Sequence, residues 1–409
     1  MTQITRRIAL AGAAVLAGSG LARAAGPAEV KIAMMVPLSG PWARSGLLEQ
    51  MGARMAIDDI NAAGGIKSLG GAKLKLIEFD AGDSAEKAKD AAQRMIAQEP
   101  DLAGGFGAWL STFTLAITEV TERAELPWMT LSYSDLITGR GFKYVFQSSP
   151  TADAQAAQLV PIIMKLAEKA TGKRPTKVAI VGDNSAASVS FYKPLKDHVF
   201  KEQGLTLVVD EVYAPPLSDA TSIVQKLRSG KPDFVLLQST NVGDDKLLVE
   251  KFAEFGLSAK KMPMIGGGGH WCAPELTKLT APENVEGVIV ALADWPGKKA
   301  AELGNRFIKR TGEPWFGHDS IFAYAHVSIL AAAIDAAQSA DRHKVAAALH
   351  SMDLTTGPAD LFPDGRVSYD EKGRRKGAQL CIVQYRNGIP TPIFPESIAT
   401  APAVWPKTS

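Results

Sequence analysis

Short apolar runs alternate along the chain with longer segments that carry apolar residues at helical spacing. "VKIAMMVPL" (30–38) predicts a strand, and "GLLEQMGARMAIDDINAAGG" (46–65) predicts an amphipathic helix that stops at its glycine pair. The further strands expected are 73–81, 102–108, 126–132, 177–183, 205–213, 233–240 and 262–267. Alternation of strand and helix is the pattern of parallel sheets that are covered by helices on both faces.

The alternation runs in two blocks, and the second begins at "KVAIVGD" (177–183). Two blocks predict two doubly wound lobes, which suits a chain of 409 residues, since single cores stop growing near roughly 250–300 residues. Ligands of open parallel sheets bind beyond the carboxyl ends of the strands. This rule selects the loops 39–45, 108–114, 131–135, 183–188, 238–243 and 267–271.

The first 24 residues resemble an export signal. An arginine pair precedes the apolar stretch 8–21, and "ARA" (22–24) supplies a cleavage site near Ala24. The pair fits a twin-arginine signal, and a general secretory signal is the alternative. No later apolar run approaches about 18 residues. We therefore expect a mature protein in the periplasm, without direct membrane insertion.

Composition narrows the class of protein. With 46% hydrophobic and 22% charged residues, the chain is typical of soluble globular proteins. Its formal charge of +2 gives no indication of a nucleic-acid surface. Cys272 and Cys381 are the two cysteines, and spacing alone leaves open whether they pair.

Motifs of common enzyme classes are missing from the sequence. No G-x-x-x-x-G-K-[ST], H-E-x-x-H or G-x-S-x-G occurs. "GGGGHW" (266–271) begins like a dinucleotide fingerprint, but Trp271 takes its sixth position. His270 and Cys272 offer two ligands, which do not make a zinc site. We expect no catalysis, no cofactor and no metal.

Several segments carry a resemblance to a known family. They are "KIAMMVPLSGPWARSG", "GARMAIDDINAAGGI", "GGFGAWLSTFTLAITEVTERAELPWMTLSYS", "GRGFKYVFQSSPTADAQ", "VAIVGDNSAASVS", "DFVLLQST" and "TTGPADLFPDGRVSYDEKG". In this order the chain resembles the leucine/isoleucine/valine-binding protein family over nearly all of residues 29–395, with "DINAAGGI" the most family-specific piece. That family comprises type I periplasmic solute-binding proteins of branched-chain amino-acid ABC transporters.

The resemblance implies an α/β fold with two doubly wound parallel-sheet lobes, joined by a three-crossover hinge that closes on a ligand. Carried onto this chain, the N-terminal lobe is 28–147 plus 295–358 and the C-terminal lobe is 148–294 plus 359–395, followed by an exposed tail, 396–409. The implied partners are a small-molecule ligand and the permease and ATPase subunits of an importer. A periplasmic sensor without transport is a further reading of the same fold.

The resemblance also implies how one lobe binds a ligand carboxylate, through small hydroxyl side chains and backbone amides at strand ends. The matching positions are Ser111, Ser132 and Ser134, with Tyr133 between the last two. Ser111 opens a predicted helix, and the free N–H groups of a helix N-terminus suit an anion. A plain helix cap is the other reading of Ser111, and both roles can coexist.

Aromatic residues are the next candidates. Those that wall the family's pocket match Tyr324 and the neighbourhood of Trp42, and Trp109 lies beside Ser111 in the loop 108–114. For each tryptophan, packing inside its own lobe is the alternative to ligand contact. Arg44 in the first loop is another candidate for a ligand carboxylate.

The C-terminal lobe departs from the family pattern. Amino-acid binders place an acidic residue for the ligand ammonium at the end of the strand that matches "MPMIGG", where this chain has glycines 267–269. Gln238 or Thr240 occupies the neighbouring loop. Burial of an unpaired ammonium costs several kcal/mol. We therefore expect a ligand with an acidic end for the serines and an apolar or aromatic end for this lobe.

On this interpretation Gly268 and its neighbours make room for the ligand, while Trp271, His270 and Trp42 stack on it. Aromatic carboxylates suit that description. A branched-chain or other amino acid is the alternative, with Asp183 or Asp244 receiving the ammonium.

Other polar groups are expected to be structural. His318, Asp319 and His326 belong to or precede an apolar helix and are interpreted as packing or surface residues. "EKGRRKG" (371–377) reads as a solvated hairpin turn.

Overall fold

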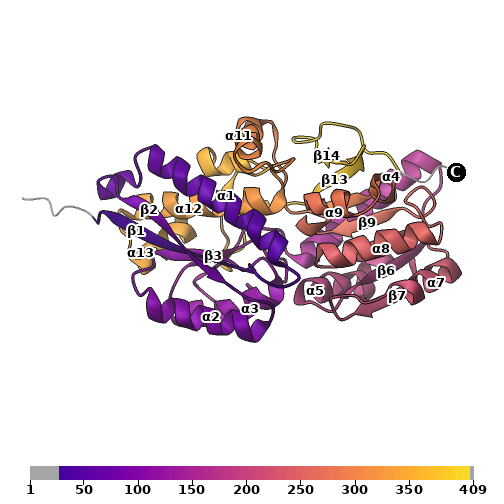
Figure 1. The fold of residues 1–409 in the computed structure, drawn as a ribbon, viewed down its shortest axis with the longest axis horizontal. Coiled ribbons are helices and arrows are strands. Elements are labelled where there is room, and N and C mark those ends of the chain that lie inside the picture. The colour runs from indigo at the N-terminus through magenta and orange to yellow at the C-terminus, as the bar shows by residue number, and fades with distance from the viewer. Residues whose placement is uncertain (1–26, 406–409) are drawn as a thin grey trace, which may run out of the picture.

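The computed structural model describes residues 27–405. The expected export signal (1–24) and the last residues of the expected tail lie outside this range. Figure 1 shows two lobes along the long axis of the molecule. We call the lobe with the five-stranded sheet the first lobe and the lobe with the seven-stranded sheet the second lobe.

The sheet of the first lobe has the strand order β2-β1-β3-β4-β5, and every pair in it is parallel. The strands are β1 Glu29–Val36, β2 Lys73–Asp80, β3 Gly104–Gly107, β4 Trp128–Thr130 and β5 Val145–Gln147. Helices α2 (Ala85–Gln98) and α3 (Ser111–Arg123) cover one face, and α1 (Ala43–Ala62) and α12 (His318–Ala337) lie on the other side (Figure 1). Ser84 caps α2 as its side chain accepts a hydrogen bond from the Lys87 N–H.

The sheet of the second lobe has the order β14-β13-β10-β9-β8-β6-β7, and its pairs are parallel except for β10–β13 and β13–β14, which are antiparallel. The strands are β6 Lys177–Asp183, β7 Thr206–Tyr213, β8 Phe234–Gln238, β9 Met264–Gly267, β10 Ile289–Leu292, β13 Cys381–Arg386 and β14 Ile389–Phe394. Its larger helices are α4 Ala152–Thr171, α5 Ala186–Pro194, α7 Thr221–Gly230, α8 Val242–Glu254 and α9 Pro274–Leu279.

Apolar residues of the central strands are buried on both faces of this second sheet. Val178 and Ile180 of β6 pack into one hydrophobic cluster with α4 and α5, whereas Ala179 and Val181 pack into the other with α7 and α8. Burial on both sides explains why "KVAIVGD" is a continuous apolar run and not an alternating one.

Smaller elements complete the chain. They are η1 Lys67–Leu69, η2 Leu195–Val199, α6 Phe200–Glu202, η3 Gly269–Cys272, α10 Pro282–Val285, η4 Lys298–Ala300, α11 Ala301–Thr311, α13 Arg342–Ser351, β11 Asp353–Leu354, η5 Gly357–Leu361 and β12 Val367–Ser368. Cys272 and Cys381 are both buried as free thiols.

The chain passes between the two sheets three times, after β5, after β10 and before β13. The expected three-crossover arrangement of two doubly wound lobes is therefore confirmed. The last crossover contains Arg375, whose guanidinium lies 2.7 Å from a carboxylate oxygen of Asp364 and above the ring of Phe362. The hairpin turn expected at 371–377 is confirmed, because Tyr369 and Arg375 pair as an antiparallel bridge. Its exposed residues are Glu371, Lys372, Lys376 and Gly377. Arg375 departs from the expectation of a solvated segment, since it is 4% exposed and packs into the hinge.

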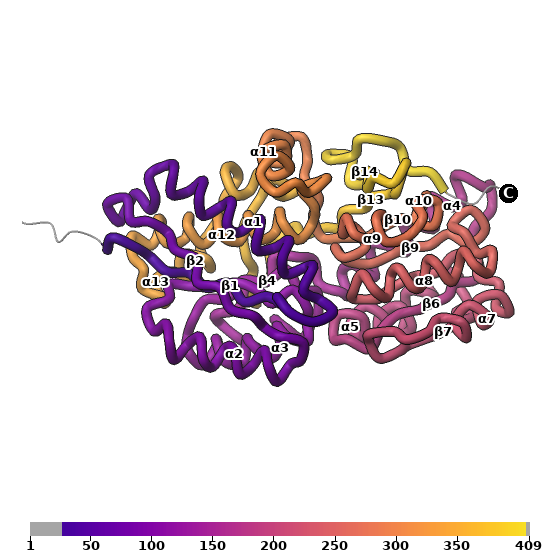
Figure 2. The backbone as a smooth tube through the Cα atoms, in the orientation of Figure 1, coloured from indigo at the N-terminus to yellow at the C-terminus, as the bar shows by residue number. Residues whose placement is uncertain are grey.

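Helix α12 lies alongside α1, although about 260 residues separate them in the chain (Figure 2). A Cβ at Gly52 of α1 would stand 2.1 Å from the Ser320 carbonyl oxygen, so glycine permits this close approach. Among the described residues, α12 has the length and apolar composition of a membrane span, but 67% of its most apolar window is buried inside the fold. Its N-terminal end reaches the strand ends of both lobes.

Candidate ligand-binding site

A small cavity of about 30 Å³ lies between the lobes, at the carboxyl ends of strands from both sheets. From the first lobe it is lined by Trp109, Leu110, Ser111, Leu131, Ser132 and Tyr133. From the second lobe it is lined by Ala187, Gln238, Ser239, Thr240, Gly267, Gly268, Gly269 and His270. His318 of α12 also lines it. Five of the six loops that the strand-end rule selects contribute to this lining, and 39–45 does not.

Ser111 organises the first-lobe wall. It stands at the start of α3, and its Oγ accepts hydrogen bonds from the backbone N–H groups of Tyr133 and Ser134, both at 3.1 Å. Because these bonds use the oxygen as acceptor, the hydroxyl hydrogen is left for another partner. Helix α3 also presents the positive end of its dipole here.

Trp109 crosses from this wall toward α12. Its Nε1 donates to Asp319 Oδ1 at 2.9 Å, and its carbonyl oxygen accepts from the Ser132 hydroxyl at 2.7 Å. Trp109 has a φ of 66°, in the left-handed region that residues other than glycine rarely adopt and that clusters at functional sites. Trp109 is thus held at its indole by Asp319 and at its backbone by Ser132.

His318 and Tyr133 form a neutral pair at the cavity. Tyr133 Oη lies 3.0 Å from His318 Nε2, and His318 Nδ1 lies 3.4 Å from the Asp294 carbonyl oxygen. Since a carbonyl only accepts, Nδ1 carries the hydrogen and Nε2 accepts from tyrosine. Burial lowers the pKa of His318 to about 3, so the ring is uncharged at neutral pH. The sequence analysis interpreted His318 as a packing or surface residue, whereas the structure places it in the cavity wall.

His270 is the ionisable group of the second-lobe wall. Its Nδ1 lies 2.6 Å from Asp245 Oδ2, and its Nε2 lies 3.1 Å from the Gly267 carbonyl oxygen. Burial lowers the pKa of His270, but the carboxylates of Asp245, Asp319 and Asp183 together raise it by more, so the net pKa lies above the usual value. The ring also meets the edge of Trp109, with 5.9 Å between centroids.

The four glycines 266–269 each lie against a side chain of the protein itself. A Cβ at these positions would meet, in order, Trp271 at 2.6 Å, Gln238 at 2.1 Å, His270 at 2.8 Å and, at Gly269, both Asp319 and His318 at 2.5 Å. The expectation that they make room for a ligand is therefore wrong. They make room for five side chains, and those of Gln238, His270 and His318 line the cavity.

Of the residues predicted to contact a ligand, seven line the cavity: Trp109, Ser111, Ser132, Tyr133, Thr240, Gly268 and His270. Two others lie beside it and join the lobes. Trp42 Nε1 donates to Thr240 Oγ1 at 3.3 Å, and Ser134 Oγ lies 2.7 Å from Ser190 Oγ of α5.

Three predicted residues lie elsewhere. Trp271 is fully buried in the core of the second lobe, so it does not stack in the cavity. Tyr324 donates to Asp59 at 2.8 Å in a groove on the outside of the first lobe. Arg44 pairs with Glu275 and Glu313 at 2.5 and 2.7 Å. Each position is decided by the direction of the side chain, which the spacing of residues does not show.

No carboxylate side chain lines the cavity within residues 27–405. Asp183 lies behind the wall and accepts from Ser188 Oγ at 2.7 Å and Thr240 Oγ1 at 2.5 Å. Asp244 accepts from the Leu217 N–H at 2.8 Å. The two acids considered for an ammonium are thus outside the lining. In the same part of the chain, no cluster of three or more metal-ligating side chains is found.

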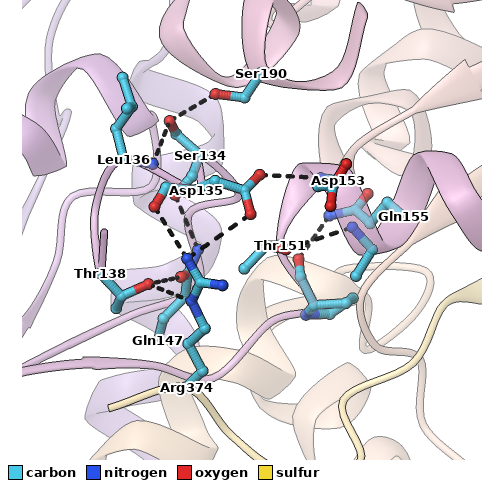
Figure 3. A network of polar contacts seen from close by, with 12 residues as sticks. Ser134, Asp135, Leu136, Thr138, Gln147, Thr151, Asp153, Gln155, Ser190 and Arg374 are labelled. Atoms are coloured by element: carbon cyan, nitrogen blue, oxygen red, sulfur yellow. Dashed lines mark hydrogen bonds and ion pairs between the residues drawn. The ribbon is translucent and has the colours of Figure 1, made fainter. Parts of the chain in front are cut away.

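A polar network ties the first-lobe wall to the hinge (Figure 3). Buried Gln147 donates through Nε2 to the carbonyl oxygens of Ser132 and Ser134 at 2.8 and 3.3 Å, and its Oε1 accepts from Thr138 at 2.9 Å. Arg374 of the last crossover donates to the same Thr138 hydroxyl at 2.7 Å. The cavity loop and two crossovers therefore share one network.

Known proteins agree with this arrangement. Residues 29–389 match the family model described as "Periplasmic binding protein". A curated relative, the Leu/Ile/Val-binding protein homolog 8 of Brucella suis, is 28% identical over 97% of this chain and 98% of its own length. The solved structure of LivJ from Streptococcus pneumoniae, in complex with isoleucine, has a TM-score of 0.75 at 20% identity and covers 88% of this chain and 97% of its own.

A second solved structure, a Rhodopseudomonas palustris solute-binding protein in complex with benzoate, also has a TM-score of 0.75. It is 17% identical and covers 92% of this chain and 99% of its own. At these identities the two structures support the fold, while the family model spans both lobes and the cavity between them. The chain belongs to the periplasmic binding protein family.

Proposed function

We propose that this protein is the substrate-binding component of an ABC importer, and that its lobes close on a small carboxylate with an aromatic or apolar body. The observation that carries the proposal is the charge of the cavity wall. Within the described residues it holds no carboxylate, but it presents the start of α3 and the hydroxyl hydrogen of Ser111 to the ligand. Such a wall favours an anion over an ammonium.

The acidic end of the ligand fits the first-lobe wall. Ser111 has an uncommitted hydroxyl hydrogen, and α3 begins at the same residue. Hydrogen bonds from a hydroxyl and from N–H groups of a helix start stabilise a carboxylate without a formal counter-charge.

The body of the ligand fits the apolar part of the cavity. Trp109, Leu131 and Ala187 face the space from both lobes. The volume of about 30 Å³ left between the lobes is far below the roughly 300–1,000 Å³ of ligand pockets, so the lobes have to move apart to admit a ring or a short aliphatic chain.

The alternative ligand is a branched-chain or other amino acid. It is supported by the names of the relatives and by the isoleucine bound to LivJ, whereas the benzoate complex supports the aromatic reading. An amino acid bound here would leave its ammonium without a carboxylate among the lining side chains, at a cost of several kcal/mol.

A thermal-shift comparison tests the proposal. Benzoate-type and cinnamate-type acids, leucine and isoleucine are added separately to the purified mature protein. A ligand at about 100 times its Kd stabilises the folded state by about 2.7 kcal/mol and raises Tm by several degrees. We expect this rise with aromatic acids. A rise with amino acids alone would contradict the aromatic reading.

The role in an importer and the periplasmic location are part of the same proposal. Removal of residues 1–24 would leave a periplasmic protein that delivers its ligand to a permease and an ATPase. N-terminal sequencing of the exported protein checks cleavage after Ala24. Stimulation of ATP hydrolysis by the ligand-loaded protein, with the genetically adjacent permease and ATPase in liposomes, checks transport against a purely sensory role.

A further inference from the structure

Most polar side chains of the cavity have their hydrogen bonds satisfied by the protein. The Ser132 hydroxyl donates to the Trp109 carbonyl oxygen at 2.7 Å, and the Ser239 hydroxyl donates to Asp245. Thr240 donates to Asp183 at 2.5 Å and accepts from Trp42 at 3.3 Å. These groups hold the wall together and have little capacity left for a ligand.

The Gln238 side chain is the exception in the second lobe. It is 6% exposed and lines the cavity at the end of β8. Its backbone carbonyl accepts from Ser188 and Tyr192 at 3.0 and 3.1 Å, but its amide makes no hydrogen bond with any other described residue. Its amide atoms are not among the fully buried polar atoms that lack a partner, so they reach the open space of the cavity, where a ligand group can take the place of water as their hydrogen-bond partner.

The position of this amide is built into the fold. A Cβ at Gly267 would stand 2.1 Å from Gln238 Oε1, so the missing side chain at Gly267 lets the amide lie along β9. Across the cavity, Ser111 holds the other uncommitted donor. The two free polar groups thus come from opposite lobes and face one enclosed space.

The charge around Gln238 determines what it can receive. The neighbouring His270 has Asp245 at 2.6 Å and the Gly267 carbonyl oxygen at 3.1 Å on its two ring nitrogens, so it forms a closed ion pair with Asp245. No lysine or arginine lines the cavity in the described part of the chain. A second carboxylate would find no free cation at this end, and an ammonium would find no free anion.

We infer that Gln238 is the specificity-determining residue for an uncharged hydrogen-bonding group at the second-lobe end of the ligand. The ligand class is then a monocarboxylate whose ring or short chain carries a hydroxyl or a similar neutral group away from the carboxylate. This inference rests on the proposed function, because it assumes that the carboxylate binds at Ser111. It differs from the sequence expectation of a wholly apolar end at the second lobe.

The test compares matched acids by isothermal titration calorimetry. Benzoate, 3-hydroxybenzoate and 4-hydroxybenzoate are titrated into the wild-type protein and into Gln238→Met, which keeps the length of the side chain and removes its amide. We expect at least one hydroxybenzoate to bind the wild type about tenfold or more tightly than benzoate does, since a site that is built around a hydrogen bond rejects the analogue without it. In Gln238→Met this ratio should fall to within about threefold.

The ratio separates recognition from a structural effect, because a general loosening of the cavity would weaken all three acids alike. Gln50→Met in α1 is the matched control: its amide donates to Glu78 at 2.9 Å, outside the cavity, and the ratio should stay at the wild-type value.

Equal affinity of the wild type for all three acids, or an unchanged ratio in Gln238→Met, would overturn the inference and leave the proposed function standing. Failure of every aromatic acid to bind the wild type would overturn both. If Gln238→Met does not fold, the wild-type series decides alone.

Discussion

Gly267 and Gln238 show how single residues set the chemistry of the cavity. They lie on neighbouring strands, β9 and β8, and the amide of one occupies the space that a side chain of the other would fill. Glycine at this position therefore has a packing role, and its consequence is a polar group in the cavity wall.

Gly267→Ala should displace this amide. The new methyl group would start 2.1 Å from Gln238 Oε1, and overpacking of this kind costs about 1–3 kcal/mol. We expect ligand affinity to fall by about tenfold or more, with a smaller loss of Tm, measured by calorimetry and thermal unfolding. Gly304→Ala in α11 is the control, since its Cβ meets Phe316 at an ordinary 3.7 Å. Wild-type affinity in Gly267→Ala would contradict the packing argument.

Asp319 is another single residue that matters here, because its carboxyl group is buried. Burial raises its pKa to about 6, although the hydrogen bond from Trp109 Nε1 lowers it. The other charged groups that influence it or are influenced by it are His270, Arg44 and Glu49. Because the folded-state pKa lies above the unfolded value, the folded state binds more protons between about pH 4 and 6. This group thus costs stability as pH rises through that window.

Asp319→Asn removes that cost and keeps an acceptor for Trp109. We expect the variant to exceed the wild type in free energy of unfolding by up to about 3 kcal/mol at pH 7.5, because a pKa shift of one unit corresponds to 1.36 kcal/mol. The difference should vanish below about pH 4. Urea unfolding at a series of pH values measures it, and a difference that does not depend on pH would rule out ionisation of Asp319 as the cause.

Arg44 joins three elements near the cavity through two ion pairs, which we call the clasp. It belongs to the first turn of α1, and it binds Glu275 of α9 in the second lobe at 2.5 Å and Glu313 of the α11–α12 connection at 2.7 Å. The clasp replaces the ligand contact that the sequence suggested for Arg44. Together with the bond from Trp42 to Thr240, it stabilises the lobes in contact.

Arg44→Ala should weaken this closed arrangement. We expect ligand dissociation to become about three- to tenfold faster, because a partly buried charge pair between two bodies acts mainly on the off-rate. The effect should shrink at high salt, which screens the pair in the wild type. Stopped-flow fluorescence at two ionic strengths measures both.

Arg54→Ala provides the comparison for this clasp. Its partner Glu78 lies in the same lobe, 2.7 Å away, so the loss of that pair does not affect contact between lobes. Equal dissociation rates in Arg44→Ala and Arg54→Ala would contradict a role of the clasp in closure.

At the scale of the whole molecule, two sheets with separate helical layers meet through the cavity and three crossovers. The network of Gln147 and Arg374 connects the first-lobe wall to these crossovers (Figure 3). Rotation of one lobe on such a hinge would open or close the cavity.

Ser134→Cys combined with Ser190→Cys should report on that motion. The two hydroxyl oxygens lie 2.7 Å apart across the lobes, close enough for thiols to pair when the lobes are in contact. We expect ligand to speed disulfide formation under mild oxidation, followed by non-reducing electrophoresis. Cys272 and Cys381 are buried and should not interfere. The Ser190→Cys variant is the control, and a rate that ligand does not change would argue against hinge closure.

The sequence by itself determined the order of strands and helices and most of the loops that line the cavity. Hydrophobic periodicity is a local property, and the strand-end rule needs only the order of elements. Ser111 at the start of α3 was visible for the same reason. The lobe boundaries and the export signal stay predictions.

Only the tertiary structure decided which side chains face the cavity. His318 enters the wall because α12 packs against α1 from a distant part of the chain, while Trp271 turns into a core and Tyr324 lies on an outer face. The role of the glycines 266–269 became clear only from the side chains that pack against them in the fold. These contacts depend on side-chain direction and on packing between segments far apart in sequence, which no local pattern of residues encodes.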